Sequence, residues 1–373
     1  MKSYTEILKD LVGLPSFTGK NNPECELPMC RYLEHIFKSD FPNLKRHTFS
    51  VGSFRPGLIF LGSPSPKVLF ACHTDTIPPS SGGQLKLKIS GDQATGLGTK
   101  DMKGGIVSSL LCLQQVKNPS KIGILFYPDE EYSQKGMLKL VKILPGMLTS
   151  RPEIIVSPES RFNLGHGARG IIVVKLELIG KKSHSSRPHL GIDAIRGFYI
   201  LHQRLETQFS QTSALGKTTF TLTHILGGAG SSTGKITDHT GTIPDIARAT
   251  ISIRNALTHL DSERLLGAIE KITHSLGLKI SHLKILADHP ARNTDPKLVK
   301  KIVALVKKES GISIKLGDPK LAGYNDAALL GTTLGSPVVN FGPYGEDNHT
   351  QKEWVSLKSI QETARVLSSI SHI

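Results

Sequence analysis

Cysteine is scarce in this chain. The 373 residues include only four cysteines, Cys25, Cys30, Cys72 and Cys112, and none lies in the paired spacing of a zinc ribbon. Small secreted domains held together by disulfides are far richer in cysteine. The scarcity excludes a disulfide framework, and we interpret all four cysteines as small apolar core residues.

Long hydrophobic runs are also lacking. No stretch approaches the roughly 18 consecutive apolar residues that a membrane helix needs. The first residues, MKSYTE, do not include the apolar segment of a secretory signal. We therefore expect a cytoplasmic protein with no membrane partner.

Acidic residues are outnumbered by basic ones. The chain has 46 Lys and Arg against 31 Asp and Glu, a formal net charge of +15. Such an excess attracts anionic ligands without giving specificity. The basic residues occur at most in pairs such as Lys181-Lys182, and there is no helix-turn-helix, zinc-finger or RNA-recognition signature. We expect no nucleic-acid partner.

The composition and the apolar pattern indicate a globular α/β protein. Hydrophobic residues make up 38% of the chain, and at roughly 150 residues per domain the length indicates two domains. Continuous apolar runs are typical of strands in a sheet that is buried on both faces. We predict helices over 4–14 and 26–37, and buried strands over 57–61, 68–72, 122–127 and 154–156.

The pattern changes between residues 170 and 286. We predict the order βαββαβ there, a ferredoxin-like unit, with strands over 171–179, 218–226, 246–253 and 278–286 and helices over 191–205 and 261–276. Helix and strand patterns then resume over 297–308, 326–330, 338–341 and 357–370. We expect a small domain, residues 170–286, inserted into a larger domain, residues 1–169 and 287–373.

Histidine and acidic residues follow the predicted strands directly or lie beside glycines. Five segments far apart in the sequence share this property: His73-Thr74-Asp75, Asp101-Met102-Lys103-Gly104-Gly105, Asp129-Glu130-Glu131, Pro158-Glu159 and Asn348-His349-Thr350. Ligands collect beyond the carboxyl ends of the strands in an open α/β sheet. Two histidines with several carboxylates are the ligand chemistry of hydrolytic zinc and related ions, and this many acids indicates a centre of two ions.

These segments resemble one known family. In the same order, the chain has the His-x-Asp, Asp-x-Lys-Gly-Gly, Asp-Glu-Glu and C-terminal His motifs of the dinuclear-metal aminoacylase and carboxypeptidase family. That family includes acetylornithine deacetylase, succinyl-diaminopimelate desuccinylase and glutamate carboxypeptidase. The run from Gly180 to Ala194, with His184, is similar to the family's lid signature. The resemblance covers nearly the whole chain and implies a zinc-exopeptidase-like catalytic domain with a mixed central sheet and an inserted lid and dimerisation domain.

The resemblance implies two divalent metal ions, with zinc as the first expectation and cobalt or manganese as alternatives. By position, Asp101 would bridge the two ions, His73 and Glu159 would bind one of them, and Glu131 and His349 would bind the other.

The resemblance assigns two further carboxylates to catalysis. Asp75 would hold the His73 imidazole in one tautomer. Glu130 matches the general base, which takes a proton from the attacking water and delivers it to the leaving amine.

The remaining assignments concern substrate. His184 matches a lid histidine that, in dimeric members, reaches the active site of the partner subunit and stabilises the oxyanion. Arg254 matches a lid arginine that pairs with a substrate carboxylate, and Arg169 and Gly323 fall in segments that line the substrate pocket. We expect a homodimer through the lid.

Three stretches depart from the family pattern or from a general motif. Glu159 follows Pro158, whereas the family usually has the acid before the proline, so Ser157 is an alternative occupant of that ligand position. Gly241 stands where the family commonly has an asparagine. The glycine-rich run 227–235 lacks two required residues of a phosphate-binding loop, because Ala229 and Ile236 occupy those positions. We interpret this run as a lid loop.

The sequence therefore favours a metal-dependent amidohydrolase of amino-acid metabolism that removes an acetyl- or succinyl-type group from an N-acyl amino acid. A dipeptidase or carboxypeptidase with the same centre is the close alternative, since both chemistries are amide hydrolysis. A non-catalytic binding protein of this fold is the third interpretation, and the complete set of histidines and carboxylates argues against it.

Overall fold

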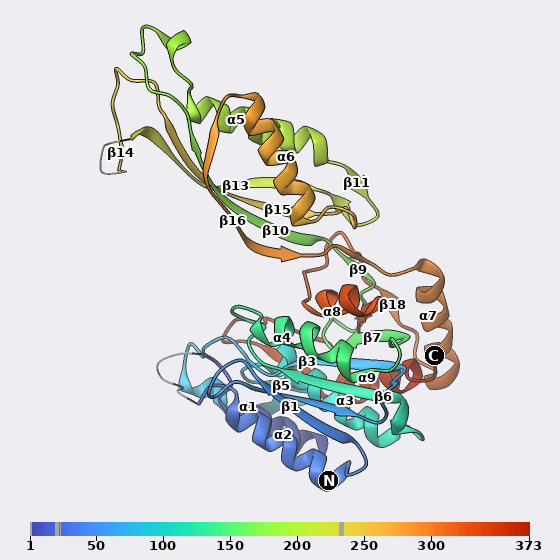
Figure 1. Ribbon diagram of the computed structural model, residues 1–373. Helices are drawn as coiled ribbons and strands as arrows, with labels where there is room; N and C mark the ends of the chain where they lie inside the picture. The colour runs from blue at the N-terminus through green and yellow to red at the C-terminus, as the bar shows by residue number, and fades with distance from the viewer. Residues whose placement is uncertain (1, 19–21, 23, 231–234) are drawn as a thin grey trace. The chain divides into compact units, whose positions relative to one another are not determined.

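The computed structural model describes residues 2–18, 22, 24–230 and 235–373. The chain folds into two compact units. Unit 1 comprises Met1–His166, Thr294–Asp318 and Asn325–Ile373, and unit 2 comprises Gly167–Asn293 and Pro319–Tyr324. Figure 1 shows the elements of both units, and each unit is described by itself below.

Unit 1 is built on a six-stranded sheet. In spatial order its strands are β1 (Lys45–Ser50), β2 (Pro56–Leu61), β6 (Ile122–Tyr127), β3 (Val68–His73), β7 (Ile154–Ser157) and β19 (Val338–Asn340). Strands β6, β3, β7 and β19 are parallel, whereas β2 is antiparallel to both of its neighbours. This arrangement confirms the mixed central sheet. Strand β1 was not predicted, because its sequence KRHTFS is mostly polar and five of its residues are not buried.

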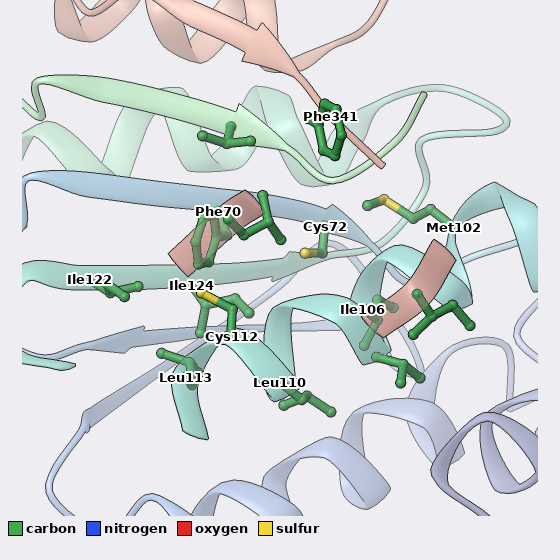
Figure 2. Packing of buried hydrophobic residues seen from close by; sticks show 14 of the residues in the cluster. Phe70, Cys72, Met102, Ile106, Leu110, Cys112, Leu113, Ile122, Ile124 and Phe341 are labelled. Carbon is green, nitrogen blue, oxygen red and sulfur yellow. The ribbon is translucent and has the colours of Figure 1, made fainter. Parts of the chain in front are cut away.

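Helices cover both faces of this sheet. Side chains alternate between the faces along a strand, so Phe70 and Cys72 belong to one apolar cluster while Leu69 and Ala71 belong to another. The first cluster also takes residues from α1 (Tyr4–Gly13), α2 (Leu27–Asp40), α3 (Gly104–Gln115), α7 (Pro296–Ser310) and α9 (Leu357–Ile370). The second takes residues from α4 (Lys135–Ile143) and α8 (Ala327–Leu334). Figure 2 shows the first cluster, where side chains of β3 and β6 pack with those of α3.

Smaller pairings complete unit 1. A four-stranded antiparallel sheet has the order β20 (Gly345–Glu346), β21 (Trp354–Ser356), β5 (Gln93–Thr95) and β4 (Lys88–Ser90). A parallel pair joins β8 (Asn163–Leu164) to β18 (Lys315–Leu316). The first of these sheets brings the segment around Asp101 and the C-terminal segment into one region of unit 1, since β21 packs beside residues 99–103.

Unit 2 has the predicted order of elements. Its strands β10 (Gly170–Ile179), β13 (Thr219–Gly230), β15 (Ile246–Asn255) and β16 (Lys279–His289) and helices α5 (Ala194–Phe209) and α6 (Ser262–Ser275) follow one another as β10-α5-β13-β15-α6-β16. All neighbouring strands are antiparallel, in the order β14-β13-β15-β10-β16, with β14 (Ile236–Thr237) at one edge. A separate apolar cluster joins both helices to this sheet. Residues 231–234 of the glycine-rich run lie outside the described residues.

Two short pairings shift the boundary between the units from the predicted positions. Strand β9 (Gly167–Ala168) pairs with β17 (Arg292–Asn293), and β16 continues to His289, so residues 167–169 and 287–293 pack with unit 2. A second pair within unit 2 joins β11 (Thr212–Ser213) to β12 (Gly216–Lys217). Residues 319–324 also belong to unit 2, which local sequence patterns did not indicate.

The first helix of unit 2 begins later than predicted. The apolar spacing favoured a start at Gly191, but α5 begins at Ala194 because Asp193 caps it. The Asp193 carboxylate accepts a hydrogen bond from the Arg196 backbone N–H, which is the typical role of an acid at this position. Among the described residues, no helix combines the length and the apolar character that crossing a membrane requires.

Candidate metal centre

His73 is the last residue of β3 and is buried. Its Nε2 lies 3.0 Å from Asp101 Oδ1, and its Nδ1 lies 3.1 Å from the backbone carbonyl of Asp75. The Asp75 carboxylate is 3.6 Å from the same Nδ1. In the neutral ring, Asp75 would hold a proton on Nδ1, mainly through its backbone oxygen, and this would leave the Nε2 lone pair for a metal ion.

Glu353 holds the loop that presents Asp101. This carboxylate is buried and accepts three backbone N–H bonds, from Gly98 at 2.8 Å and from Lys100 and Asp101 at 3.0 Å each. The peptide bond after Asp101 is cis. The two Asp101 oxygens face different partners, since Oδ1 faces His73 whereas Oδ2 accepts from Asn348 Nδ2 at 3.0 Å. The two oxygens of the Asp101 carboxylate thus point to different partners.

The turn after β6 carries two of the predicted residues, and Asp75 anchors it. The Glu130 and Glu131 backbone N–H groups donate to the two Asp75 carboxylate oxygens, at 3.0 and 2.9 Å. Asp129 before them has a positive φ of 71° and accepts from the Lys135 N–H at 3.1 Å. The Asp75 carboxylate therefore sets the position of both glutamates in addition to lying near His73.

Arg55 supports this turn through ion pairs with buried carboxylates. Its guanidinium donates to the Asp129 carboxylate and lies 3.4 Å from Glu26 Oε2, and both carboxylates are buried. Asp129 also accepts from the Ser133 hydroxyl. The sequence did not indicate this network, because its charged members are up to 103 residues apart, from Glu26 to Asp129.

Glu159 lies two residues beyond the end of β7. Its Oε2 accepts a hydrogen bond from Asn325 Nδ2 at 3.1 Å, and its Oε1 lies 3.9 Å from the ammonium of Lys100. The alternative residue Ser157 is fully buried, and its hydroxyl oxygen accepts from the same Asn325 Nδ2 at 3.1 Å.

His349 completes the cluster from the C-terminal segment. Its Nε2 lies 3.0 Å from Glu131 Oε1 and 3.5 Å from Asp101 Oδ2, and about half of its side chain is exposed. The residue has a positive φ of 64°.

Two groups of possible metal-binding residues result. The ligand atoms of His73, Asp101 and Glu159 lie within 4.8 Å of one another, and so do those of Asp101, Glu131 and His349. Asp101 is common to both groups. One imidazole nitrogen and carboxylate oxygens in each group suit zinc and related divalent ions, so these donor sets fit two metal ions.

Hydrogen bonds and burial shift the pKa values at this cluster in opposite directions. Burial opposes charge on both Asp101 and His73. Hydrogen bonds from His349 and His73 nevertheless hold the pKa of Asp101 well below its usual range, and hydrogen bonds to Asp101 and Asp75 hold the pKa of His73 well above its usual range. Hydrogen bonds to Asp101 and Glu131 raise the pKa of His349 to about 10. Burial, with the nearby charge of Asp326, raises the pKa of Glu130 well above its usual range.

Burial also raises the pKa of Glu159, and the negative charge of Asp101 adds to this effect. Negative charge is therefore crowded here, and cations would relieve the repulsion.

Four predicted residues belong to unit 2. His184 is exposed, and its Nδ1 lies 2.8 Å from the Ser186 hydroxyl. Arg254 is an exposed residue of β15, and Arg169 donates to the Lys217 carbonyl at 3.4 Å. Gly323 is exposed in the segment 319–324. Their predicted roles toward substrate stay predictions, whereas the seven residues predicted from His73 to His349 in unit 1 are brought together.

The chain is similar to known proteins of one family. The sequence model of peptidase family M20/M25/M40 matches residues 69–372. A succinyl-diaminopimelate desuccinylase of Ruthia magnifica subsp. Calyptogena magnifica is 24% identical over 385 residues, covering 98% of this chain and 97% of the relative. A probable succinyl-diaminopimelate desuccinylase of Staphylococcus aureus is 26% identical over 223 residues, covering 56% of this chain and 52% of the relative.

Solved structures share the fold. The aminopeptidase PepT from Bacillus cereus has a TM-score of 0.71 at 18% identity, covering 98% of this chain and 96% of that one. The metallo-carboxypeptidase Sso-CP2 from Sulfolobus solfataricus has a TM-score of 0.68 at 14% identity, covering 100% and 99%.

Proposed function

The chain belongs to peptidase family M20/M25/M40 and is a metal-dependent hydrolase, and from that premise we propose that it removes an acetyl- or succinyl-type acyl group from an N-acyl amino acid. The observation that carries the proposal is the pair of ligand groups that share Asp101, with Glu130 beside them on a fixed turn. The full-length similarity to a desuccinylase favours the succinyl branch of this chemistry.

We assign the metal ligands as the two groups divide them. His73 and Glu159 would hold one ion, and Glu131 and His349 would hold the other. Asp101 would contact both ions. Zinc is the first choice, and cobalt or manganese are alternatives. When bound, the ions supply a water of lowered pKa and polarise the amide carbonyl.

Glu130 acts as the general base in this proposal. Its carboxylate takes a proton as water attacks the amide carbon, and it returns that proton to the leaving nitrogen when the carbon–nitrogen bond breaks. A raised pKa suits this double role, because the carboxyl group must both accept and donate a proton near neutral pH. Asp75 fixes Glu130 through its backbone N–H.

Unit 2 would recognise the substrate. We propose that Arg254 pairs with the substrate carboxylate, that His184 stabilises the oxyanion from the partner subunit of a homodimer, and that Arg169 and Gly323 line the pocket. The exposure of Arg254 and His184 within unit 2 is compatible with contacts to other molecules. A cytoplasmic location belongs to the same proposal.

Peptide-bond hydrolysis is the second candidate. The matched family is one of peptidases, and the same residues could hydrolyse a peptide amide. The difference lies in the shape of the substrate pocket.

Release of free amine tests the proposal and separates the candidates. Zinc- or cobalt-loaded protein is incubated with acetyl- and succinyl-amino acids and with di- and tripeptides, and a chelated sample is the control. We expect chelator-sensitive hydrolysis with the highest kcat/KM on an N-acyl amino acid. A preference for peptides would transfer the conclusion to the second candidate, and no turnover from a sample with two bound ions would contradict both.

A further inference from the structure

The Glu159 carboxylate is held by a residue that the proposed mechanism does not use. Asn325 is 5% exposed and lies 166 residues further along the chain. Its Nδ2 donates to Glu159 Oε2 at 3.1 Å and to Ser157 Oγ at 3.1 Å. Both amide hydrogens are therefore directed toward the segment from Ser157, at the end of β7, to Glu159.

The orientation of this amide is fixed by its other end. Asn325 Oδ1 accepts a hydrogen bond from the Ala327 backbone N–H at 3.0 Å, at the start of α8. Reversing the amide would place Oδ1 against the Glu159 carboxylate and would leave the Ala327 N–H facing an NH2 group. The Ser157 hydroxyl could donate to a reversed amide, but the bonds to Glu159 and Ala327 would both be lost, so the orientation with Nδ2 toward Glu159 is favoured.

Glu159 thus has a different neighbour on each carboxylate oxygen. Oε2 is bonded to Asn325, whereas Oε1 has no amide partner among the described residues and lies 3.9 Å from the Lys100 ammonium. The bond to Asn325 restricts the rotation of the Glu159 side chain. It also offsets part of the cost of burying a carboxylate among other acids.

Ser157 is poorly suited to bind a metal ion itself. Its hydroxyl oxygen already accepts from Asn325, and a neutral hydroxyl is a weaker zinc ligand than a carboxylate. Ser157 and Glu159 are therefore two acceptors of one amide, and only Glu159 brings a charge to the cluster.

We propose that Asn325 is a positioning residue for the metal ion of the His73–Asp101–Glu159 group, holding Glu159 through Oε2 so that Oε1 is offered to the ion. The inference rests on the proposed function, because it requires that two ions bind. Partners that orient metal ligands typically contribute 10- to 100-fold in metal affinity.

The test is a calorimetric titration, in which zinc is added to chelator-treated protein and the heat of binding is measured. We expect wild type to bind two ions, and Asn325→Ala to bind one ion with unchanged affinity and the other about 10- to 100-fold more weakly. Ser157→Ala is the matched control, because it removes the other acceptor of the same amide, and we expect its two affinities to stay within about threefold of wild type.

Double variants identify which ion is affected. Asn325→Ala should weaken zinc binding further in a His349→Ala background, where only the first group is left, and should add little in a Glu159→Ala background. Asn325→Ser covers the case that the alanine variant fails to fold, since a hydroxyl can still accept from the Ala327 N–H but is too short to reach Glu159. We expect it to weaken the same ion.

Three results would overturn the inference alone, and the first two concern Asn325→Ala. These are an Asn325→Ala variant that binds both ions as tightly as wild type, and an equal effect of Asn325→Ala in the two backgrounds. A loss in Ser157→Ala as large as that in Glu159→Ala would also overturn it, because Ser157 would then be the ligand. A wild-type protein that binds no zinc would overturn the proposed function together with the inference.

Discussion

In the proposed mechanism, Glu130 is the residue on which the chemistry depends most. We expect Glu130→Gln to keep both metal ions and to lose kcat by about 10²- to 10⁴-fold, because the amide cannot take the proton from water. The glutamine keeps the backbone bond to Asp75 and the shape of the side chain. Steady-state kinetics with metal analysis of the same sample is the measurement, and near-full activity would remove Glu130 from the base role.

The raised pKa values of the two histidines lead us to expect that metal affinity depends on pH. Hydrogen bonds to carboxylates raise the pKa of His73 well above its usual range and that of His349 to about 10, despite the opposing effect of burial. Both rings are therefore protonated at neutral pH before metal binds, and each must lose its proton to become a ligand. Affinity should rise with pH, by up to about tenfold per unit for each proton released.

Calorimetry in two buffers of different ionisation enthalpy counts these protons. We expect one to two protons released for the two zinc ions, and fewer in His349→Ala. A proton count of zero between pH 6 and 8 would show that the rings are already neutral in the metal-free protein.

Three elements meet at a buried charge network beside the turn that carries Glu130 and Glu131. Glu26, immediately before α2, Arg55, immediately before β2, and Asp129, after β6, come from three separate elements. Burial, with the charge of Asp75, raises the pKa of Glu26 to about 7. Two carboxylates share one guanidinium here, so ionising Glu26 costs stability in the folded state.

From this network we predict that Glu26→Gln raises the free energy of unfolding, relative to wild type, by more at high pH than at low pH. The folded pKa of about 7 lies above the ordinary value of 4.5, so the unfolded chain loses its proton first and wild-type stability falls between these two pH values. Relative to wild type, the free energy of unfolding of the variant should increase by on the order of 2 kcal/mol between pH 5 and pH 8. Any constant change in stability from loss of the ion pair between Arg55 and Glu26 cancels when the effects at pH 5 and pH 8 are subtracted.

Urea denaturation at both pH values measures the change. Glu24→Gln is the control, because Glu24 is an exposed acid two residues away. A Glu26→Gln effect that is the same at pH 5 and pH 8 would show that Glu26 is ionised normally in the folded protein.

The elements also show what could be predicted from sequence. Strands such as β3 and β6 are continuous apolar runs, and buried sheets require such runs, so the mixed sheet and the order of unit 2 were predicted correctly. His73 and Glu131 could be proposed because they follow such strands within recognisable motifs. The Asn325–Glu159 bond could not, because it joins segments 166 residues apart and no local pattern encodes an amide's partner. Local patterns likewise gave no sign of the positive φ of Asp129, the residue before the two glutamates.

The whole molecule is expected to work as a homodimer, and subunit mixing tests this. Glu130→Gln and His184→Ala should each be nearly inactive alone. If His184 acts in the partner's active site, a mixed dimer contains one complete site, so an equal mixture after subunit exchange should recover about a quarter of wild-type activity. No recovery, with exchange shown by light scattering and differently tagged subunits, would place His184 in its own subunit's site.

The central claim is that Asp101 is shared by two metal ions, and a crystal of the zinc-loaded protein tests it most directly. Anomalous scattering at the zinc edge should give two peaks about 3.5–4 Å apart, one beside His73 and Glu159 and the other beside Glu131 and His349. A single peak, or peaks that lie away from Asp101, would contradict the claim.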